Sequence, residues 1–119
     1  MNYSEMKDHE INAAVGEAMG WNAKFIHQDD SVTFRDDLGR LRGRKNYCNS
    51  WADAGPIIQQ NLIDLEAIFE FTDESEGQLE PTGLWAARAV VKGFIHPRAE
   101  DKNPLRAAMI VFLMMQEKK

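Results

Sequence analysis

The sequence predicts an α+β fold, a small antiparallel β-sheet with about three α-helices packed against it, on both of its faces. Two patterns indicate this mixture. Apolar and polar residues alternate over residues 63–72, as in a half-buried strand, whereas residues 105–115 are almost continuously apolar and follow a helix-start signal. The chain has 119 residues, of which 44% are hydrophobic and 28% charged, which suits one core without metals or disulfides. We therefore expect a single domain over residues 1–119.

The first predicted helix covers residues 8–19. Asp8 is the expected N-cap, and Glu10 is well placed in the positively polarised first turn. Apolar residues recur at helical spacing in a narrow stripe, and Gly20 is suited to a left-handed stop. A narrow stripe predicts a helix that packs on one side only.

Two short strands are expected next, at residues 24–27 and 32–35, with a tight turn between them. Residues 36–46 contain Gly39 and Gly43 and have little apolar content. Segments of this kind are seldom part of a core. We therefore expect residues 36–46 to form a loop or a mobile hairpin tip.

A second helix is predicted to begin near Ser50, because Ser50 and Asp53 have the spacing of a capping box. Pro56 conflicts with a smooth helix, since its ring would clash with the carbonyl group of Ala52. We expect a capped first turn, then a kink, and a short helical segment that ends with Asn61 in a left-handed conformation.

The clearest strand covers residues 63–72, and a second strand is predicted at 84–95 after turn-forming residues at 72–83. Cross-strand ion pairs contribute roughly 0.2–1 kcal/mol each. If these strands form a hairpin, such pairs arise on its outer face among Asp64, Glu66, Arg88 and Lys92.

A third helix is predicted to start with Asn103 as N-cap and Pro104 in the first helical position. Within residues 105–115 every residue except Arg106 is apolar. A helix that is apolar all round must be covered all round. It is therefore either the central helix of the domain or a helix that meets another subunit on one side.

Charge is distributed unevenly along the chain, whose net charge is −5 and whose isoelectric point is about 5.1. Residues 35–45 carry five basic and two acidic side chains, whereas residues 64–80 carry seven acidic and no basic ones. A chain this acidic repels duplex DNA unless its positive charge is concentrated. The concentrated cations are Arg40, Arg42, Arg44 and Lys45.

These four cations are candidates for binding a nucleic acid or another anionic partner. Alternate arginines in a strand would align three guanidinium groups on one side, where they can grip phosphates. However, no aromatic residue lies within the cluster, and no recognition-helix motif is present. A solvated loop, or a contact with the acidic surface of a partner or sister subunit, is the stronger interpretation.

Cys48 is the single cysteine, which excludes an internal disulfide and favours a reducing compartment. It precedes a predicted helix N-terminus, where a thiol pKa is lowered, so one hypothesis is a reactive thiolate with His27 or His96 as its base. The alternative, which we favour, is a small buried residue. His9, His27 and His96 lack metal-ligand spacing, so we expect neither a metal nor a cofactor.

Three segments, residues 8–20, 47–63 and 103–113, together resemble the NinX-like family of bacteriophage proteins. The middle segment includes a Tyr-Cys-Asn entry to its helix, and the last begins Asn-Pro-Leu-Arg. The resemblance implies an α-β-α sandwich and an accessory protein of a phage or prophage, encoded near replication and recombination functions. It supplies no catalytic residues. Residues 21–46 and 64–102 lie outside it, so the strands there depend on pattern alone.

No phosphate-binding loop, dinucleotide fingerprint, nucleophile elbow or metalloprotease motif occurs in the chain. The first five residues do not have the pattern of a secretory signal, so we expect none, and the longest apolar run, residues 107–115, is about half of a membrane span. We therefore expect a non-enzymatic protein-binding module in the bacterial cytoplasm, with a host or phage protein as partner and a homodimer as one form. The alternative is a nucleic-acid-associated factor that uses residues 40–45. A small enzyme built around Cys48 is the third hypothesis.

Overall fold

The computed structural model describes residues 2–71, 77–90 and 96–117. Three α-helices and six strands occur in this part of the chain, together with one 3₁₀ turn, Tyr3–Glu5. In chain order the helices and strands are α1 (Asp8–Ala18), β1 (Asn22–Ile26), β2 (Val32–Arg35), β3 (Leu41–Lys45), α2 (Trp51–Gln60), β4 (Ile63–Phe71), β5 (Leu79–Ala89), β6 (Arg98–Asp101) and α3 (Pro104–Glu117).

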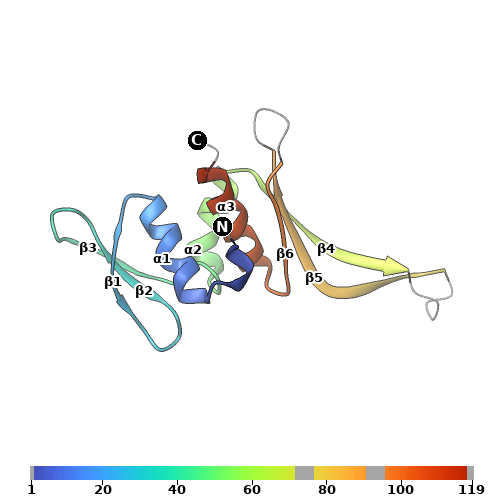
Figure 1. The fold of residues 1–119 in the computed structure, drawn as a ribbon, viewed down its shortest axis with the longest axis horizontal. Coiled ribbons are helices and arrows are strands. Elements are labelled where there is room, and N and C mark those ends of the chain that lie inside the picture. Colours follow the sequence, from blue (N-terminus) through green and yellow to red (C-terminus); the bar gives the residue numbers. More distant parts are fainter. Residues whose placement is uncertain (1, 72–76, 91–95, 118–119) are drawn as a thin grey trace.

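Two antiparallel sheets enclose the helices, as Figure 1 shows. The first sheet has the order β1-β2-β3, and the second has the order β4-β5-β6. Helix α1 packs on β1 and β2, whereas α3 packs on all three strands of the second sheet and α2 packs on α3 and β4. The predicted α+β class with three helices is confirmed. The layers differ from an α-β-α sandwich, because the helices lie between two sheets.

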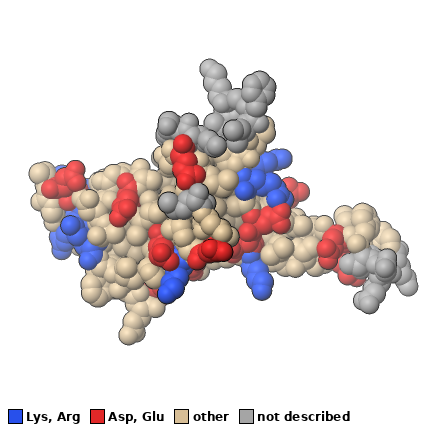
Figure 2. Space-filling model, viewed as in Figure 1, with Lys and Arg blue, Asp and Glu red and all other residues tan. Residues whose placement is uncertain are grey.

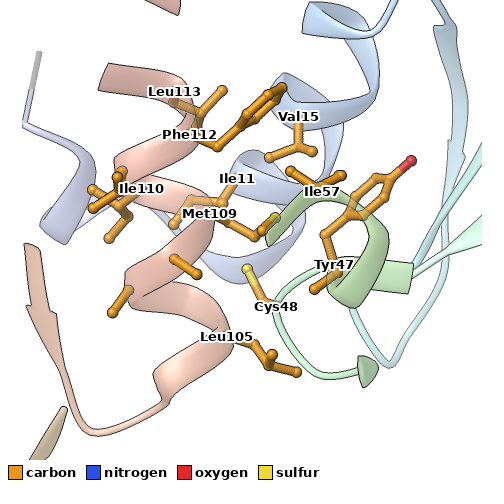
Figure 3. Close-up of a cluster of buried hydrophobic side chains, with 14 of the residues drawn as sticks. Ile11, Val15, Tyr47, Cys48, Ile57, Leu105, Met109, Ile110, Phe112 and Leu113 are labelled. Atoms are coloured by element: carbon orange, nitrogen blue, oxygen red, sulfur yellow. The ribbon is translucent and has the colours of Figure 1, made fainter. Parts of the chain in front are cut away.

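Helix α3 explains this order of layers. Residues 105–113 are all buried, including Arg106. Figure 3 shows Met109 between α3 and the side chains of α1, with Ile110 turned the other way. Because the helix is apolar on every side, it needs cover on every side. Helices α1 and α2 supply one part of this cover and the second sheet supplies the other, so α3 is the central helix.

Helix α3 also begins where the sequence predicts. The Asn103 side-chain oxygen accepts the backbone N–H of Leu105 at 2.9 Å, so Asn103 is the N-cap. At α1, by contrast, Asp8 is the first helical residue and Lys7 is the N-cap. The Asp8 carboxylate binds Arg106 at 2.7 Å instead of capping its own helix. A tertiary ion pair has therefore replaced the local cap.

Strand β3 lies within residues 36–46, for which the sequence predicts a loop or a mobile hairpin tip. The Asp36 carboxylate accepts the backbone N–H groups of Leu38 and Arg40, both at 2.9 Å, and so forms the tight turn that precedes the strand. Gly43, with φ of +111°, forms a bulge opposite Phe34. As the edge of its sheet, β3 has mostly exposed side chains, so it lacks the apolar alternation that indicates a strand.

Helix α2 is assigned as one helix from Trp51 to Gln60 despite Pro56 in its interior. The Ser50 hydroxyl accepts the backbone N–H of Asp53 at 3.3 Å, which confirms the predicted N-cap. The Asp53 carboxylate does not complete the capping box, because it accepts the backbone N–H of Asn46 at 2.9 Å.

The end of α2 differs from the prediction by one residue. Asn61 has φ of −100°, and it is Leu62 that takes the left-handed conformation, with φ of +53°. The Asn61 side chain donates to the carbonyl oxygen of Ile57 at 2.8 Å and so closes the last turn. A side-chain hydrogen bond thus replaces the predicted left-handed asparagine.

Strands β4 and β5 form the predicted hairpin, and the expected ion pair between Asp64 and Arg88 is present at 3.3 Å. Glu66 lies opposite Ala86 and not a basic residue, and Lys92 lies outside the described residues. Strand β5 begins at Leu79, five residues before the predicted start, so the predicted turn is shorter. Strand β6, for which the sequence gives no signal, pairs with residues 85–88.

The hairpin is longer than the sheet that contains it. Because β6 reaches only to the pair Trp85–Asp101, the outer part of the hairpin is a two-stranded ribbon, and Figure 1 shows it projecting beyond the helices. We call residues 68–71 and 79–83 the arm. The radius of gyration is 16.0 Å, against about 13.5 Å for a compact domain of this length. The molecule measures 60 × 37 × 24 Å.

Candidate functional site

Strand β3 places the predicted cations on two different sides of the first sheet. Arg44 pairs with Thr33 and bonds to the Ser31 hydroxyl. Arg42 instead lies over the ring of Trp21, with 4.1 Å between the guanidinium carbon and the ring centroid. The bulge at Gly43 breaks the alternation of the strand. The arginines of the Arg-x-Arg-x-Arg motif are therefore not aligned on one side, as the regular spacing predicts.

Three of the four predicted cations lie near carboxylates of this chain, and two of them are within hydrogen-bond distance. Arg40 Nε lies 2.7 Å from Asp36, and Arg44 Nη2 lies 3.0 Å from Asp29. Lys45 Nζ lies 3.7 Å from Asp53 on α2. Much of the local positive charge is thus already balanced within the protein.

The carboxylates of this region are poised to remain ionised. The Ser31 hydroxyl and backbone N–H lower the pKa of Asp29 to about 2, with a smaller contribution from Arg44. The backbone N–H of Arg40, followed by its side chain, likewise lowers the pKa of Asp36. These shifts arise from hydrogen bonds that stabilise the charged form, and they keep the turns on either side of β2 acidic.

A pocket of about 300 Å³ lies between β3 and α2, on the side of the sheet that carries Arg42. Its lining combines aromatic, basic, acidic and aliphatic residues that are far apart in the sequence. They include Trp21, Arg42, Lys45, Tyr47, Asp53 and Ile57. The sequence gives no sign that an aromatic residue belongs to the basic cluster, because Trp21 precedes β1 and reaches Arg42 only through the fold. The pocket gives this part of the predicted basic site a concave shape.

Two of the three segments that carry the family resemblance, residues 8–20 and 103–113, meet at a buried arginine. Arg106 of α3 binds Asp8 at 2.7 Å and Asp101 at 3.1 Å, and it also donates to the backbone carbonyl groups of Ser4 and Met6. An arginine offers five donors in a fixed fork, which suits such a set of acceptors. Arg106 therefore ties the N-terminal residues to the central helix.

Asparagines continue this polar cluster toward α2. Asn12 donates to Asn46 at 2.9 Å and accepts the backbone N–H of Cys48 at 2.9 Å. Asn103 donates to the Cys48 carbonyl oxygen at 2.7 Å. In the described residues no fully buried side-chain nitrogen or oxygen atom lacks a hydrogen-bond partner. The hydrogen-bonding groups of this polar cluster are therefore satisfied within the protein, as is typical of a cluster with a structural role.

Cys48 lies inside this polar cluster and is fully buried. Burial, helped by the nearby Asp8 carboxylate, raises the pKa of its thiol to about 12, which opposes formation of a thiolate. His27, one of the two bases considered, is hydrogen bonded to the Thr33 hydroxyl at 2.7 Å, and His96 is exposed. These surroundings favour the structural interpretation of Cys48.

The described residues contain no group of three or more histidine, cysteine or acidic side chains close enough to hold a metal ion. His9 lies 3.2 Å from Asp30, and no third such ligand joins them. In the same part of the chain, no helix is long and apolar enough to cross a membrane.

The arm carries an exposed apolar face that sequence reasoning missed. Phe69, Phe71 and Leu79 are 50%, 67% and 56% exposed. Phe71 lies opposite Leu79, and Phe69 lies opposite Pro81, so the four share one face. The pattern of residues 63–72 assigns both phenylalanines to the buried side of the strand. Both lie beyond the irregular pairing between Ala67 and Phe69, in the part of the hairpin that projects away from the helices in Figure 1.

The opposite face of the arm is acidic. Glu70 and Glu80 lie directly opposite each other, and residues 64–80 contain no basic residue. Figure 2 shows acidic but no basic side chains on the visible outer part of the arm. Like charges directly opposite each other destabilise a strand pair. The arm thus combines apolar side chains without cover and carboxylates without a partner of opposite charge among the described residues.

Comparison with known families shows that residues 2–116 match the family described as bacteriophage P22, NinX. The matched region includes β3, the pocket and both strands of the arm, so these features belong to the same family domain as the segments of the resemblance. A comparison with curated proteins gives no match.

Proposed function

The chain belongs to the NinX family of bacteriophage proteins, and from that premise we propose that it is a non-enzymatic accessory protein that binds another protein through its arm. The observation that carries this proposal is the apolar face formed by Phe69, Phe71 and Leu79 on a ribbon that projects from the domain. Large contiguous apolar patches on the surface of a soluble protein often mark interaction sites.

The charge of the arm indicates the chemistry of the partner. The opposed Glu70 and Glu80 gain stability from a nearby cation, and the arm supplies none of its own. A partner segment that combines apolar side chains with lysine or arginine would cover both faces of the arm. Complementary charges of this kind mainly speed the association of two proteins and fix how they align, and they add less to the affinity.

The backbone of the arm also offers a way to bind. Strand β4 is an edge strand, so one side of it has no neighbouring strand in its sheet. A two-stranded ribbon is marginally stable by itself, and a third strand adds backbone hydrogen bonds to it. A second copy of this chain is a weaker candidate for that strand, because it would place acidic residues of β4 against acidic residues.

The homodimer stays a prediction. An open side of α3 would have supported it, but α3 is covered within the protomer. The nucleic-acid alternative, in which Arg40, Arg42, Arg44 and Lys45 act together, is weakened because Arg40 and Arg44 are bound to carboxylates of this chain. Protein binding through the arm is therefore the function that the geometry supports best.

Capture experiments with matched variants test this proposal. Tagged wild-type protein is used to capture partners from a lysate of infected host cells, beside Phe71→Ser and Phe25→Ser. Phe25 is 61% exposed on β1 and so matches Phe71 in exposure but lies on the other sheet. We expect the wild type and Phe25→Ser to retain the same basic protein and Phe71→Ser to lose it.

Two results would contradict the proposal. One is a wild-type protein that captures nothing above background. The other is a captured protein that Phe71→Ser retains as well as Phe25→Ser does. Circular dichroism of both variants checks that they are folded, which we expect because both side chains are exposed.

A further inference from the structure

We infer that the pocket between β3 and α2 binds a nucleobase joined to a phosphate, either in a free nucleotide or within a single-stranded nucleic acid. This site is separate from the arm and does not depend on the proposed protein partner. Its volume of about 300 Å³ is within the range of small-ligand pockets. Aromatic, apolar and basic side chains line the pocket together. A nucleotide needs this combination, because its base is flat and apolar on its faces and its phosphate is an anion.

Arg42 is the first residue that supports this inference. Of the four cations predicted to bind anions, it alone has no carboxylate partner among the described residues, and it alone stacks on an aromatic ring. The cation–π contact with Trp21 restrains the guanidinium group without using its N–H donors. Arginine planes and aromatic rings are the surfaces on which proteins stack unpaired bases.

Lys45 provides a second positive charge in the same pocket. Its Nζ lies 3.7 Å from Asp53 Oδ1, which is longer than a hydrogen bond. The other Asp53 oxygen already accepts the backbone N–H of Asn46. A phosphate is a stronger acceptor for an ammonium group than a carboxylate held at this distance, so Lys45 is available to a ligand.

Tyr47 and Ile57 complete the pocket with one donor and an apolar wall. Burial raises the pKa of Tyr47 to about 12, so its hydroxyl stays protonated at neutral pH. Figure 3 shows this hydroxyl at the outer end of the ring, away from the core cluster. It has no hydrogen-bond partner within the described residues, whereas Ile57 faces the core and the pocket floor.

The placement of the other cations argues against a duplex as the ligand. Arg44 lies on the opposite side of the sheet and Arg40 is bound to Asp36. Two cations in one pocket are too few to follow the phosphates of a double helix, which typically requires several contacts. They are sufficient for one base and its phosphate.

Fluorescence titration tests the inference. In a Trp51→Phe/Trp85→Phe protein, Trp21 is the remaining tryptophan, and it is titrated with adenosine and cytidine monophosphates and with a 15-nucleotide oligothymidylate. Ribose 5-phosphate serves as a probe without a base. Calorimetry on the wild type repeats the titration without the two substitutions. We expect saturable quenching by at least one base-bearing probe, and much weaker binding of ribose 5-phosphate.

Substitutions locate the binding. We expect Arg42→Gln and Lys45→Gln each to weaken binding about tenfold, and Arg44→Gln, on the other side of the sheet, to change it less than about twofold. Binding of monophosphates as tight as that of the oligonucleotide identifies a free nucleotide, and binding of the oligonucleotide alone identifies a single strand. The inference is overturned if no probe binds at millimolar concentration, if ribose 5-phosphate binds equally well, or if Arg44→Gln weakens binding as much as Arg42→Gln.

Discussion

The first sheet and the arm differ in whether their charged residues have partners of opposite charge. Around β3, three cations are paired with carboxylates, and the acidic turns are stabilised by hydrogen bonds. In the arm, Glu70 and Glu80 lie opposite each other and apolar side chains are exposed beside them. The basic cluster is the more conspicuous feature of the sequence, yet the arm has more unsatisfied chemistry. The comparison shows that dense charge in the sequence can be satisfied within the protein, whereas an inconspicuous segment can leave its interactions incomplete.

Satisfied and exposed charges can be compared throughout the chain, and the largest effect is expected on replacing the buried arginine of α3. Arg106→Met leaves Asp8 and Asp101 without their buried cation, so we expect a loss of about 3 kcal/mol in the free energy of unfolding. Arg88→Met removes only the exposed pair with Asp64, which we expect to cost less than about 0.5 kcal/mol. Urea denaturation measures both, and equal losses would contradict the distinction.

Two helical glycines provide a second comparison. A Cβ atom at Gly16 of α1 would lie 2.1 Å from the ring of Phe34, which is fully buried, so we expect Gly16→Ala to destabilise the protein by about 2 kcal/mol. Gly55 of α2 has no atom within 4 Å of the same position. Gly55→Ala is expected to stabilise the protein by about 0.5–1 kcal/mol.

Thermal or urea unfolding of the two alanine variants provides the measurement. If the two substitutions change the free energy of unfolding in opposite directions, the first sheet packs closely against α1 at Gly16, whereas α2 has open space at Gly55. If Gly16→Ala is neutral, the sheet does not approach α1 as closely as the structure shows.

A charge reversal in the arm is expected to have a smaller effect. Glu80→Lys places a cation opposite Glu70, so it should raise the free energy of unfolding by about 0.5 kcal/mol. Glu66→Lys is the control, because Glu66 lies opposite Ala86 and no acidic pair is relieved. We expect Glu80→Lys also to weaken capture of a basic partner. A variant that is more stable and binds equally well would show that the acidic face does not contact the partner.

The smallest predicted effect concerns the pKa of Asp29, which hydrogen bonds hold near 2. Because the folded-state pKa is lowered, this carboxyl stabilises the protein above its ordinary pKa, and that contribution is lost as the pH falls from about 4 to about 2. Ser31→Ala removes the largest cause and should raise the pKa of Asp29 more than Arg44→Gln does. NMR titration measures both, and the reverse order would assign the shift to the ion pair.

Local signals in the sequence predict the central helix well. Asn103 and Pro104 define its start, and its apolar surface predicts that it is covered all round. The order of the layers does not follow from this, because complete cover can come from helices or from sheets. The Asp64–Arg88 pair follows from hairpin pairing, since alternation fixes which side chains share a face.

Features that depend on irregular strands escape the sequence. The bulge at Gly43 separates Arg42 from Arg44, and Trp21 joins Arg42 only in the folded chain. In β4, the single break in the alternating pattern, Ile68, lies where the strand pairing becomes irregular and the arm begins. Periodicity indicates which side of a strand is apolar, but it does not reveal whether another element covers that side. The exposure of Phe69 and Phe71 was therefore not predictable from the pattern.

Photo-crosslinking in infected cells tests the central claim about the arm most directly. A photoreactive amino acid is placed at Leu79 in the arm or at Phe25 on β1, two exposed positions on different sheets. We predict a discrete adduct with another protein from position 79 and none from position 25. An adduct from position 25 alone, or from neither position, would contradict the assignment of the arm as the binding surface.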